Sequence, residues 1–154
     1  MQWQQVAPDF EWDGSWRDLY VLGTSRADWQ TVWQLLRTLE PPPVFSVGGV
    51  AGAMPEHVDT AFDARATTSS LLSFEVGRIG FDCHFFTPDE IEFSFDPRRI
   101  TGPAEAETLA GFMKRLGDVT GKPVILAYEG AQEAEIARFC PAADEVRWAA
   151  YHRP

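Results

Sequence analysis

One histidine and three carboxylates occupy positions that a β-sheet would bring together. Asp82, His84, Glu90 and Glu92 fall at alternate positions of two adjacent predicted strands between residues 71 and 96. Because successive side chains of a strand point to opposite faces, all four would share one face, with His84 opposite Glu92. Such a group suits acid–base catalysis, metal binding or recognition of a basic protein. A flat, solvated sheet face lacks a water-excluding cleft, so we favour an acidic face with one ion pair, or a binding surface.

A glycine-rich loop containing Gly48, Gly49 and Gly52 is the second candidate site. It follows a predicted strand, as phosphate-binding loops do. Its spacing is neither G-x-G-x-x-G nor G-x-x-x-x-G-K-[ST], and no lysine follows that would reach a phosphate. We therefore expect a loop that needs the backbone freedom of glycine rather than a nucleotide site.

The nucleophilic side chains lack the neighbours that would activate them. Cys83 and His84 are adjacent in one strand and so point to opposite faces. Cys83 and Cys140 show no C-x-x-C or zinc-type spacing, and we expect neither a disulfide nor bound zinc. No serine lies in G-x-S-x-G, and His57 and His152 stand alone. The sequence thus predicts no catalytic residue, no cofactor and no metal, and it favours a protein that is not an enzyme.

Two tryptophans near the N-terminus, Trp12 and Trp16, lie among acidic residues. Exposed aromatic side chains among acids are typical of protein-interaction hot spots, although packing of both rings against the first helix fits the pattern equally well. The candidate partner-binding residues are therefore Asp82, His84, Glu90, Glu92, Asp96, Trp12 and Trp16.

A three-stranded antiparallel meander at 71–96 positions most of these residues. Gly77-Arg78 predicts a two-residue turn that pairs Phe74 with Phe81, and a three-residue loop at 87–89 continues the same register into the third strand. This register places ten apolar side chains on one face: Leu72, Phe74, Val76, Ile79, Phe81, Cys83, Phe85, Ile91, Phe93 and Phe95.

The rest of the chain alternates between predicted helices and strands, with residues 48–69 the least regular part. Helices are predicted after the N-cap Ser25 as far as Leu39, from Thr101 to Gly117, and over Gln132–Phe139. Strands are predicted at Leu19–Leu22, Val44–Val47, Pro123–Tyr128 and Val146–Tyr151, the last at a sheet edge. A turn at Asp13–Ser15 is predicted to place Trp12 opposite Trp16.

The chain of 154 residues predicts a single domain spanning 1–154, and its net charge is −10 with a pI near 4.6. A field of this sign disfavours nucleic acid and anionic membranes as partners and favours a basic macromolecule or a cation. The N-terminus lacks the basic and apolar regions of a secretion signal, and no apolar run would span a bilayer. We therefore expect a cytoplasmic protein that binds neither nucleic acid nor membrane.

Two segments resemble parts of small acidic uncharacterised bacterial proteins. They are Glu11-Trp12-Asp13-Gly14-Ser15-Trp16-Arg17-Asp18-Leu19-Tyr20-Val21, followed by a Trp-containing helix, and Gly121-Lys122-Pro123-Val124-Ile125-Leu126-Ala127-Tyr128-Glu129. Several such proteins are associated with polymorphic toxin systems as immunity proteins. The resemblance implies a small inhibitor of another protein and brings no catalytic residues with it.

These observations predict an α+β fold with a mixed, mostly antiparallel sheet of about six or seven strands. Two main helices and one short helix are predicted on one face, and the other face is acidic. The function predicted first is binding of a basic protein partner, in particular as an immunity-type inhibitor of a basic toxin. The alternative is a small enzyme or ligand-binding domain that uses the glycine-rich region 48–69 as a pocket wall. The sequence predicts no particular oligomeric state.

Overall fold

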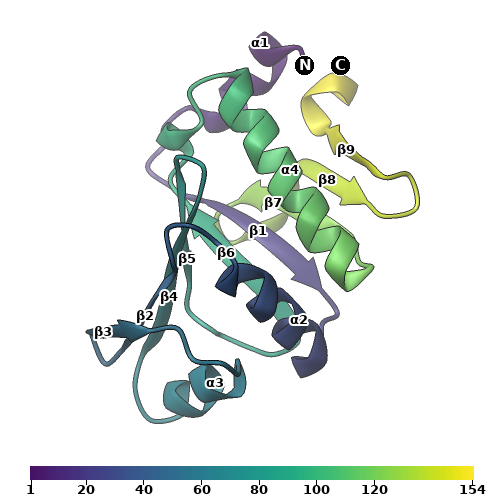
Figure 1. Ribbon diagram of the computed structural model, residues 1–154. Helices are drawn as coiled ribbons and strands as arrows, with labels where there is room; N and C mark the ends of the chain where they lie inside the picture. The colour runs from purple at the N-terminus through teal and green to yellow at the C-terminus, as the bar shows by residue number, and fades with distance from the viewer.

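Nine strands form one sheet in which every pair of neighbours is antiparallel, as the computed structural model of residues 1–154 shows (Figure 1). The order across the sheet is β3-β2-β4-β5-β6-β1-β7-β8-β9. The strands are β1 (Arg17–Leu22), β2 (Val44–Val47), β3 (Val50–Ala53), β4 (Ser70–Val76), β5 (Ile79–Cys83), β6 (Glu90–Phe95), β7 (Val124–Tyr128), β8 (Ala131–Cys140) and β9 (Glu145–Trp148).

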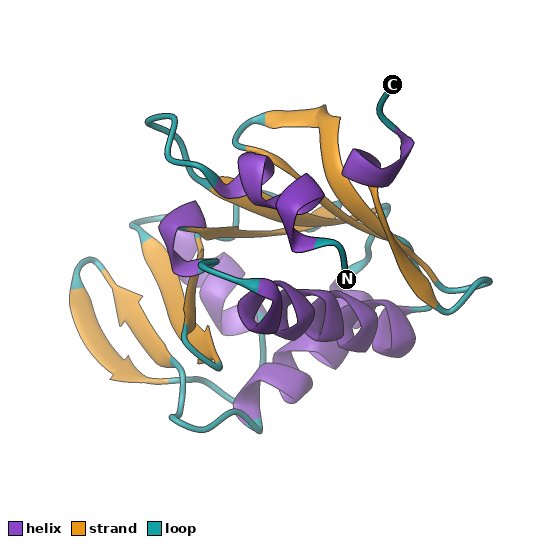
Figure 2. Ribbon diagram, turned by 90° about the horizontal axis from the view of Figure 1, so that it is seen from above, coloured by secondary structure: helices purple, strands orange, loops and turns teal.

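The helices cover one face of this sheet, which curves around the two longest of them (Figure 2). They are α1 (Trp3–Val6), α2 (Arg26–Arg37), α3 (Asp59–Arg65) and α4 (Pro103–Thr120), with short 3₁₀ helices η1 (Ala7–Phe10), η2 (Pro97–Arg99) and η3 (Ala149–His152). We call the face beneath α2 and α4 the inner face and the opposite one the outer face. None of the helices combines the length and the apolar content that a membrane crossing requires.

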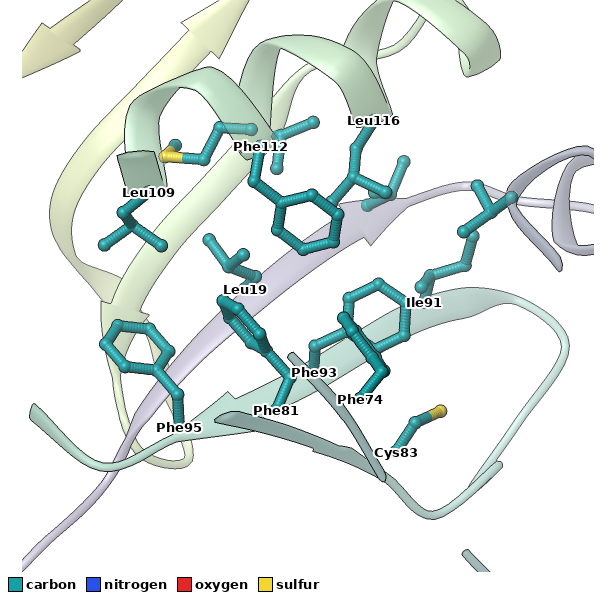
Figure 3. Packing of buried hydrophobic residues seen from close by; sticks show 14 of the residues in the cluster. Leu19, Phe74, Phe81, Cys83, Ile91, Phe93, Phe95, Leu109, Phe112 and Leu116 are labelled. Carbon is teal, nitrogen blue, oxygen red and sulfur yellow. The ribbon is translucent and has the colours of Figure 1, made fainter. Parts of the chain in front are cut away.

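The meander has the predicted register. Phe74 pairs with Phe81 across the turn, where Gly77 adopts a φ of +60°, and Phe81 pairs with Phe95 as the same register requires. Of the ten side chains assigned to the apolar face, nine are buried and Val76 is half-buried. The rings of Phe74, Phe81 and Phe93 pack against Phe112 of α4, with 5.1 Å between the centroids of Phe81 and Phe112 (Figure 3). The alternation of apolar residues in the meander therefore supplies the side chains of the inner face that pack beneath α4.

The predicted pairing of His84 with Glu92 is wrong, because the ladder between β5 and β6 ends at Asp82 and Ser94. Beyond Cys83 the chain leaves the sheet, and Phe85 adopts a φ of +58°, which is uncommon for a residue other than glycine. This bend buries the Phe85 ring in a cluster with aromatic rings of α2, α3 and β2, namely Trp29, Trp33, Phe62 and Phe45. The Phe85 ring thus packs against four aromatic rings in place of the remaining rungs of the ladder.

The sheet has nine strands rather than six or seven because two further segments join it. Residues 132–139, predicted as a helix, belong to β8, which pairs with β7 on one side and β9 on the other. Residues 50–53, predicted as part of an irregular loop, form β3. Gly48 and Gly49 make the tight turn of the β2–β3 hairpin with φ values of +56° and +81°. The last strand does lie at the sheet edge, but it ends at Trp148 and continues as η3.

The predicted helix ends are partly correct. Ser25 caps α2 as predicted, with its hydroxyl accepting a bond from the backbone N–H of Asp28. The helix α4 does not end at Gly117 but runs to Thr120, and Gly121 provides the left-handed cap with a φ of +67°. Gly117 instead allows close packing, since a Cβ there would lie 2.2 Å from the Phe139 ring.

The N-terminal segment forms α1 and η1 rather than the predicted hairpin, and Trp12 does not face Trp16 across a strand pair. The buried guanidinium of Arg17 holds the segment in place. It donates hydrogen bonds to the carbonyl oxygens of Asp9 and Glu11 and to Asp13 Oδ1. A buried guanidinium is stable only when its donors are satisfied, so these bonds fix the path of the chain into β1.

Candidate functional site

The outer face carries a row of polar side chains that runs across four strands. The registers align Ser73, Asp82, Ser94 and Asp18 on β4, β5, β6 and β1. The Ser73 hydroxyl donates to Asp82 Oδ1 at 2.8 Å, and the Ser94 hydroxyl donates to Asp18 Oδ1 at 2.8 Å. Serine hydroxyls thus hold the carboxylates of this row in fixed positions.

The hairpin between β7 and β8 folds over part of the outer face. The register of β8 shifts near Ala127, and the Gly130 N–H donates to Asp18 Oδ2 at 3.0 Å. Gln132 Nε2 donates to Glu90 Oε2 at 2.9 Å. The hairpin leaves Asp18 and Tyr20 buried, and burial together with the Asp18 carboxylate raises the pKa of Tyr20. The outer face over β2, β4, β5 and β6 remains open.

A groove of about 560 Å³ lies on this open part of the face. Its lining residues are Trp16, Pro41, Pro42, Val44, Ser73, Phe74, Glu75, Arg78, Gly80, Phe81, Asp82, Asp96 and Arg99. Gly80 leaves the space open, since a Cβ there would meet no atom within 4 Å. The expectation of a flat face without a cleft is therefore wrong, and the groove brings together three of the predicted residues.

The charges of the groove are mixed. Asp96 accepts bonds from both Arg98 Nε and Nη2, and these bonds lower the pKa of its carboxyl. The Arg98 guanidinium also lies 4.0 Å from the centre of the Trp12 ring, which places this predicted tryptophan beside the groove. Arg78 and Arg99 form no ion pair. A ligand of this groove would therefore meet free positive and negative groups.

A second group of side chains, which we call the Phe86 patch, consists of Leu22, His84, Phe86, Glu90 and Glu92. Phe86 is 62% exposed, and its ring stacks on that of His84 with 5.5 Å between centroids. Leu22 is 39% exposed and pairs with Glu90 across β1 and β6. Phe86, Glu90 and Glu92 lie around one narrow crevice that is too small to admit a water molecule. Apolar and acidic side chains therefore meet in one place.

Glu92 is the most perturbed carboxyl of the outer face. Burial raises its pKa to about 7, and the negative charges of Asp18, Glu90 and Glu129 act in the same direction. No arginine, lysine or histidine forms an ion pair with Glu92 or Glu90. A positive charge brought from outside would therefore stabilise the ionised form of Glu92.

The structure divides the predicted partner-binding residues between these two places. Asp82, Asp96 and Trp16 line the groove with Trp12 beside it, whereas His84, Glu90 and Glu92 belong to the Phe86 patch. Sequence reasoning did not assign Phe86 or Leu22 to the site. Both occupy outward positions of predicted strands, and an apolar residue at such a position is the signal that would have identified them.

The other candidate residues show no arrangement of this kind. Cys83 is buried, which raises the pKa of its thiol to about 12, and both cysteines are free. None of the residues that line the groove comes from the region 48–69. No three His, Cys, Asp or Glu side chains lie together in positions that would hold a metal ion.

Comparison of the chain with protein-family models, with curated proteins and with solved structures finds no match. The function of the outer face is therefore inferred from its geometry and charge.

Proposed function

We propose that this protein binds a basic protein partner through the outer face of its sheet, as an immunity-type inhibitor of a basic toxin. The observation that carries the proposal is the combination of acidic and apolar side chains on the open part of this face. The inner face is filled by α2 and α4, so the outer face is the sheet surface available to a partner. Four of the eight exposed large hydrophobic side chains lie on it or at its margin: Trp12, Leu22, Val44 and Phe86.

The charge of the chain supports a basic partner. The net charge of −10 would attract a cationic protein from a distance and speed its encounter with the inhibitor. At contact, the exposed apolar side chains would provide the surface whose burial holds the complex together. Charge thus accounts for the rate of association, and apolar contact accounts for the lifetime of the complex.

The experiment that tests the proposal is co-purification from the native host followed by mapping of the interface by hydrogen exchange. We expect a partner with a basic isoelectric point, and slower exchange in β4, β5 and β6 and around Phe86 in the complex. The exposed surfaces of α2 and α4 serve as the internal control and should exchange unchanged. An acidic partner, or protection confined to the helices, would contradict the proposal.

The groove favours a second function, binding of a small molecule that carries both charges. Its volume of about 560 Å³ is typical of ligand pockets. Its walls come from residues 16, 41–44, 73–82 and 96–99. A ligand bound in the groove would therefore not contact the region 48–69, which the sequence predicted as the pocket wall. Gly80→Leu would fill the groove, so this second function predicts that the variant loses small-molecule binding.

A further inference from the structure

We propose that the Phe86 patch is the anchor of the partner interface and receives an apolar side chain that the partner presents between arginine or lysine residues. This inference rests on the proposed function and specifies the chemistry of the partner at one place. Phe86 and Leu22 would contact the apolar side chain of the partner, and Glu90 and Glu92 would pair with the flanking cations.

Phe86 is held outward by the burial of the residue before it. The Phe85 ring lies 5.6 Å from Trp29 and 5.8 Å from Phe62 between centroids, and the backbone reaches this position through the left-handed conformation of Phe85. The two neighbouring side chains point in opposite directions, since Phe85 is 2% exposed and Phe86 is 62% exposed. Phe86 is the most exposed aromatic side chain among the large hydrophobic residues at the surface.

The patch is ordered before a partner arrives. The His84 and Phe86 rings are nearly parallel, with 23° between their planes, so each restricts the rotation of the other. Leu22 is the last residue of β1 and pairs with Glu90 of β6, which holds its backbone on that side. Binding to an ordered apolar surface loses less side-chain entropy, which is a property of interface hot spots.

The charges beside Phe86 select the kind of partner. The Glu90 carboxylate accepts a bond from the neutral Gln132 amide, and neither Glu90 nor Glu92 is paired with a cation of this chain. The acids Asp18 and Glu129 lie near enough to Glu92 to raise its pKa further. An acidic partner, including a second copy of this chain with its own charge of −10, would therefore be repelled. A leucine or similar residue between two cations complements both the ring and the carboxylates.

Three capped tripeptides test this inference on the intact protein without a known partner. The probes are acetyl-Arg-Leu-Arg-amide, acetyl-Arg-Gly-Arg-amide and acetyl-Glu-Leu-Glu-amide, titrated to about 10 mM while backbone amide signals are followed by NMR. We expect saturable shifts of the signals of Leu22, His84, Phe86 and Glu90 with Arg-Leu-Arg. Arg-Gly-Arg should bind at least about threefold more weakly, and Glu-Leu-Glu should not bind.

Phe86→Ser should weaken Arg-Leu-Arg binding by about tenfold or more. The matched control is Val50→Ser, which removes a side chain that is 74% exposed on β3 at the edge of the sheet and should leave binding unchanged. The inference is overturned if Arg-Leu-Arg causes no saturable shift, if Glu-Leu-Glu binds equally well, or if the shifts lie at Trp16 and Gly80 instead. Equal binding by wild type and Phe86→Ser would overturn it as well.

Kinetics with the co-purified partner separate this inference from the proposed function. Phe86→Ala should raise the dissociation rate by about tenfold or more and leave the association rate nearly unchanged. If the partner is basic but Phe86→Ala leaves the dissociation rate unchanged, the anchor is elsewhere and the proposed function survives. If the partner is acidic, the proposed function fails together with the inference.

Discussion

Replacing Glu92 by glutamine should stabilise the protein at neutral and alkaline pH. In the folded protein the pKa of Glu92 is raised from 4.5 to about 7 by burial and by neighbouring carboxylates. The folded state therefore binds a proton more tightly than the unfolded state does. Stability from this group is fully present below about pH 4.5 and is lost as the pH rises through 7. Glutamine keeps the shape of the protonated acid and carries no charge, so it removes this loss.

The magnitude follows from the size of the shift. One pKa unit corresponds to about 1.4 kcal/mol, so a shift from 4.5 to about 7 sets an upper limit of about 3 kcal/mol. Because Glu92 is only half-buried, solvent screening brings the expected gain for Glu92→Gln to about 1–2 kcal/mol at pH 8. At pH 4 the variant and the wild type should be equally stable.

Urea unfolding measured between pH 4 and pH 8 provides the assay. The free energy of unfolding of the wild type should fall relative to that of Glu92→Gln as the pH rises. Glu133→Gln is the matched control, since Glu133 is an exposed acid on β8 and its replacement should leave the pH dependence as in the wild type. If the curves for wild type and Glu92→Gln run parallel over the whole range, the acidic environment assigned to Glu92 is wrong.

The remaining predictions concern the core. Phe93→Ala should cost about 3–5 kcal/mol in the free energy of unfolding, because Phe93 is fully buried, and a loss below about 1 kcal/mol would show that the ring is not core. Gly117→Ala should lower stability by about 1–3 kcal/mol, since the new Cβ would overlap the Phe139 ring. The control is Gly111→Ala on the same helix, where the new Cβ would meet open space and stability should rise by about 0.5–1 kcal/mol. Thermal unfolding measures both variants. If Gly117→Ala proved more stable than Gly111→Ala, the close packing of α4 against Phe139 would be refuted.

The meander could be predicted because its alternation must satisfy three strands and two turns with one register. The strand β8 could not, because its Ala, Gln and Glu residues are frequent in helices and only pairing with β7 and β9 decides its conformation. The conformation of the N-terminal segment could not be predicted either, because it depends on hydrogen bonds from the Arg17 side chain to the backbone carbonyl oxygens of Asp9 and Glu11.

The candidate site could be predicted only in part. Strand parity places Asp82, Glu90 and Glu92 on one face, as the structure has them. The groove arises where Pro41 and Pro42 approach a face whose opposite rim carries Trp16, and no local pattern shows which segments meet across a sheet. The outward position of Phe86 follows from the burial of Phe85 beside α2 and α3, which is a long-range contact as well.

The most direct test of the proposed function is the salt dependence of association with the co-purified partner. Glu90→Lys/Glu92→Lys should slow association and flatten its salt dependence, because the two changes reverse charge where the partner docks. The control Glu56→Lys/Glu107→Lys makes the same change in net charge at exposed sites beside α2 and on α4, and should slow association much less. Circular dichroism should show that both variants are folded. Equal association rates for the two double variants would contradict binding through the outer face.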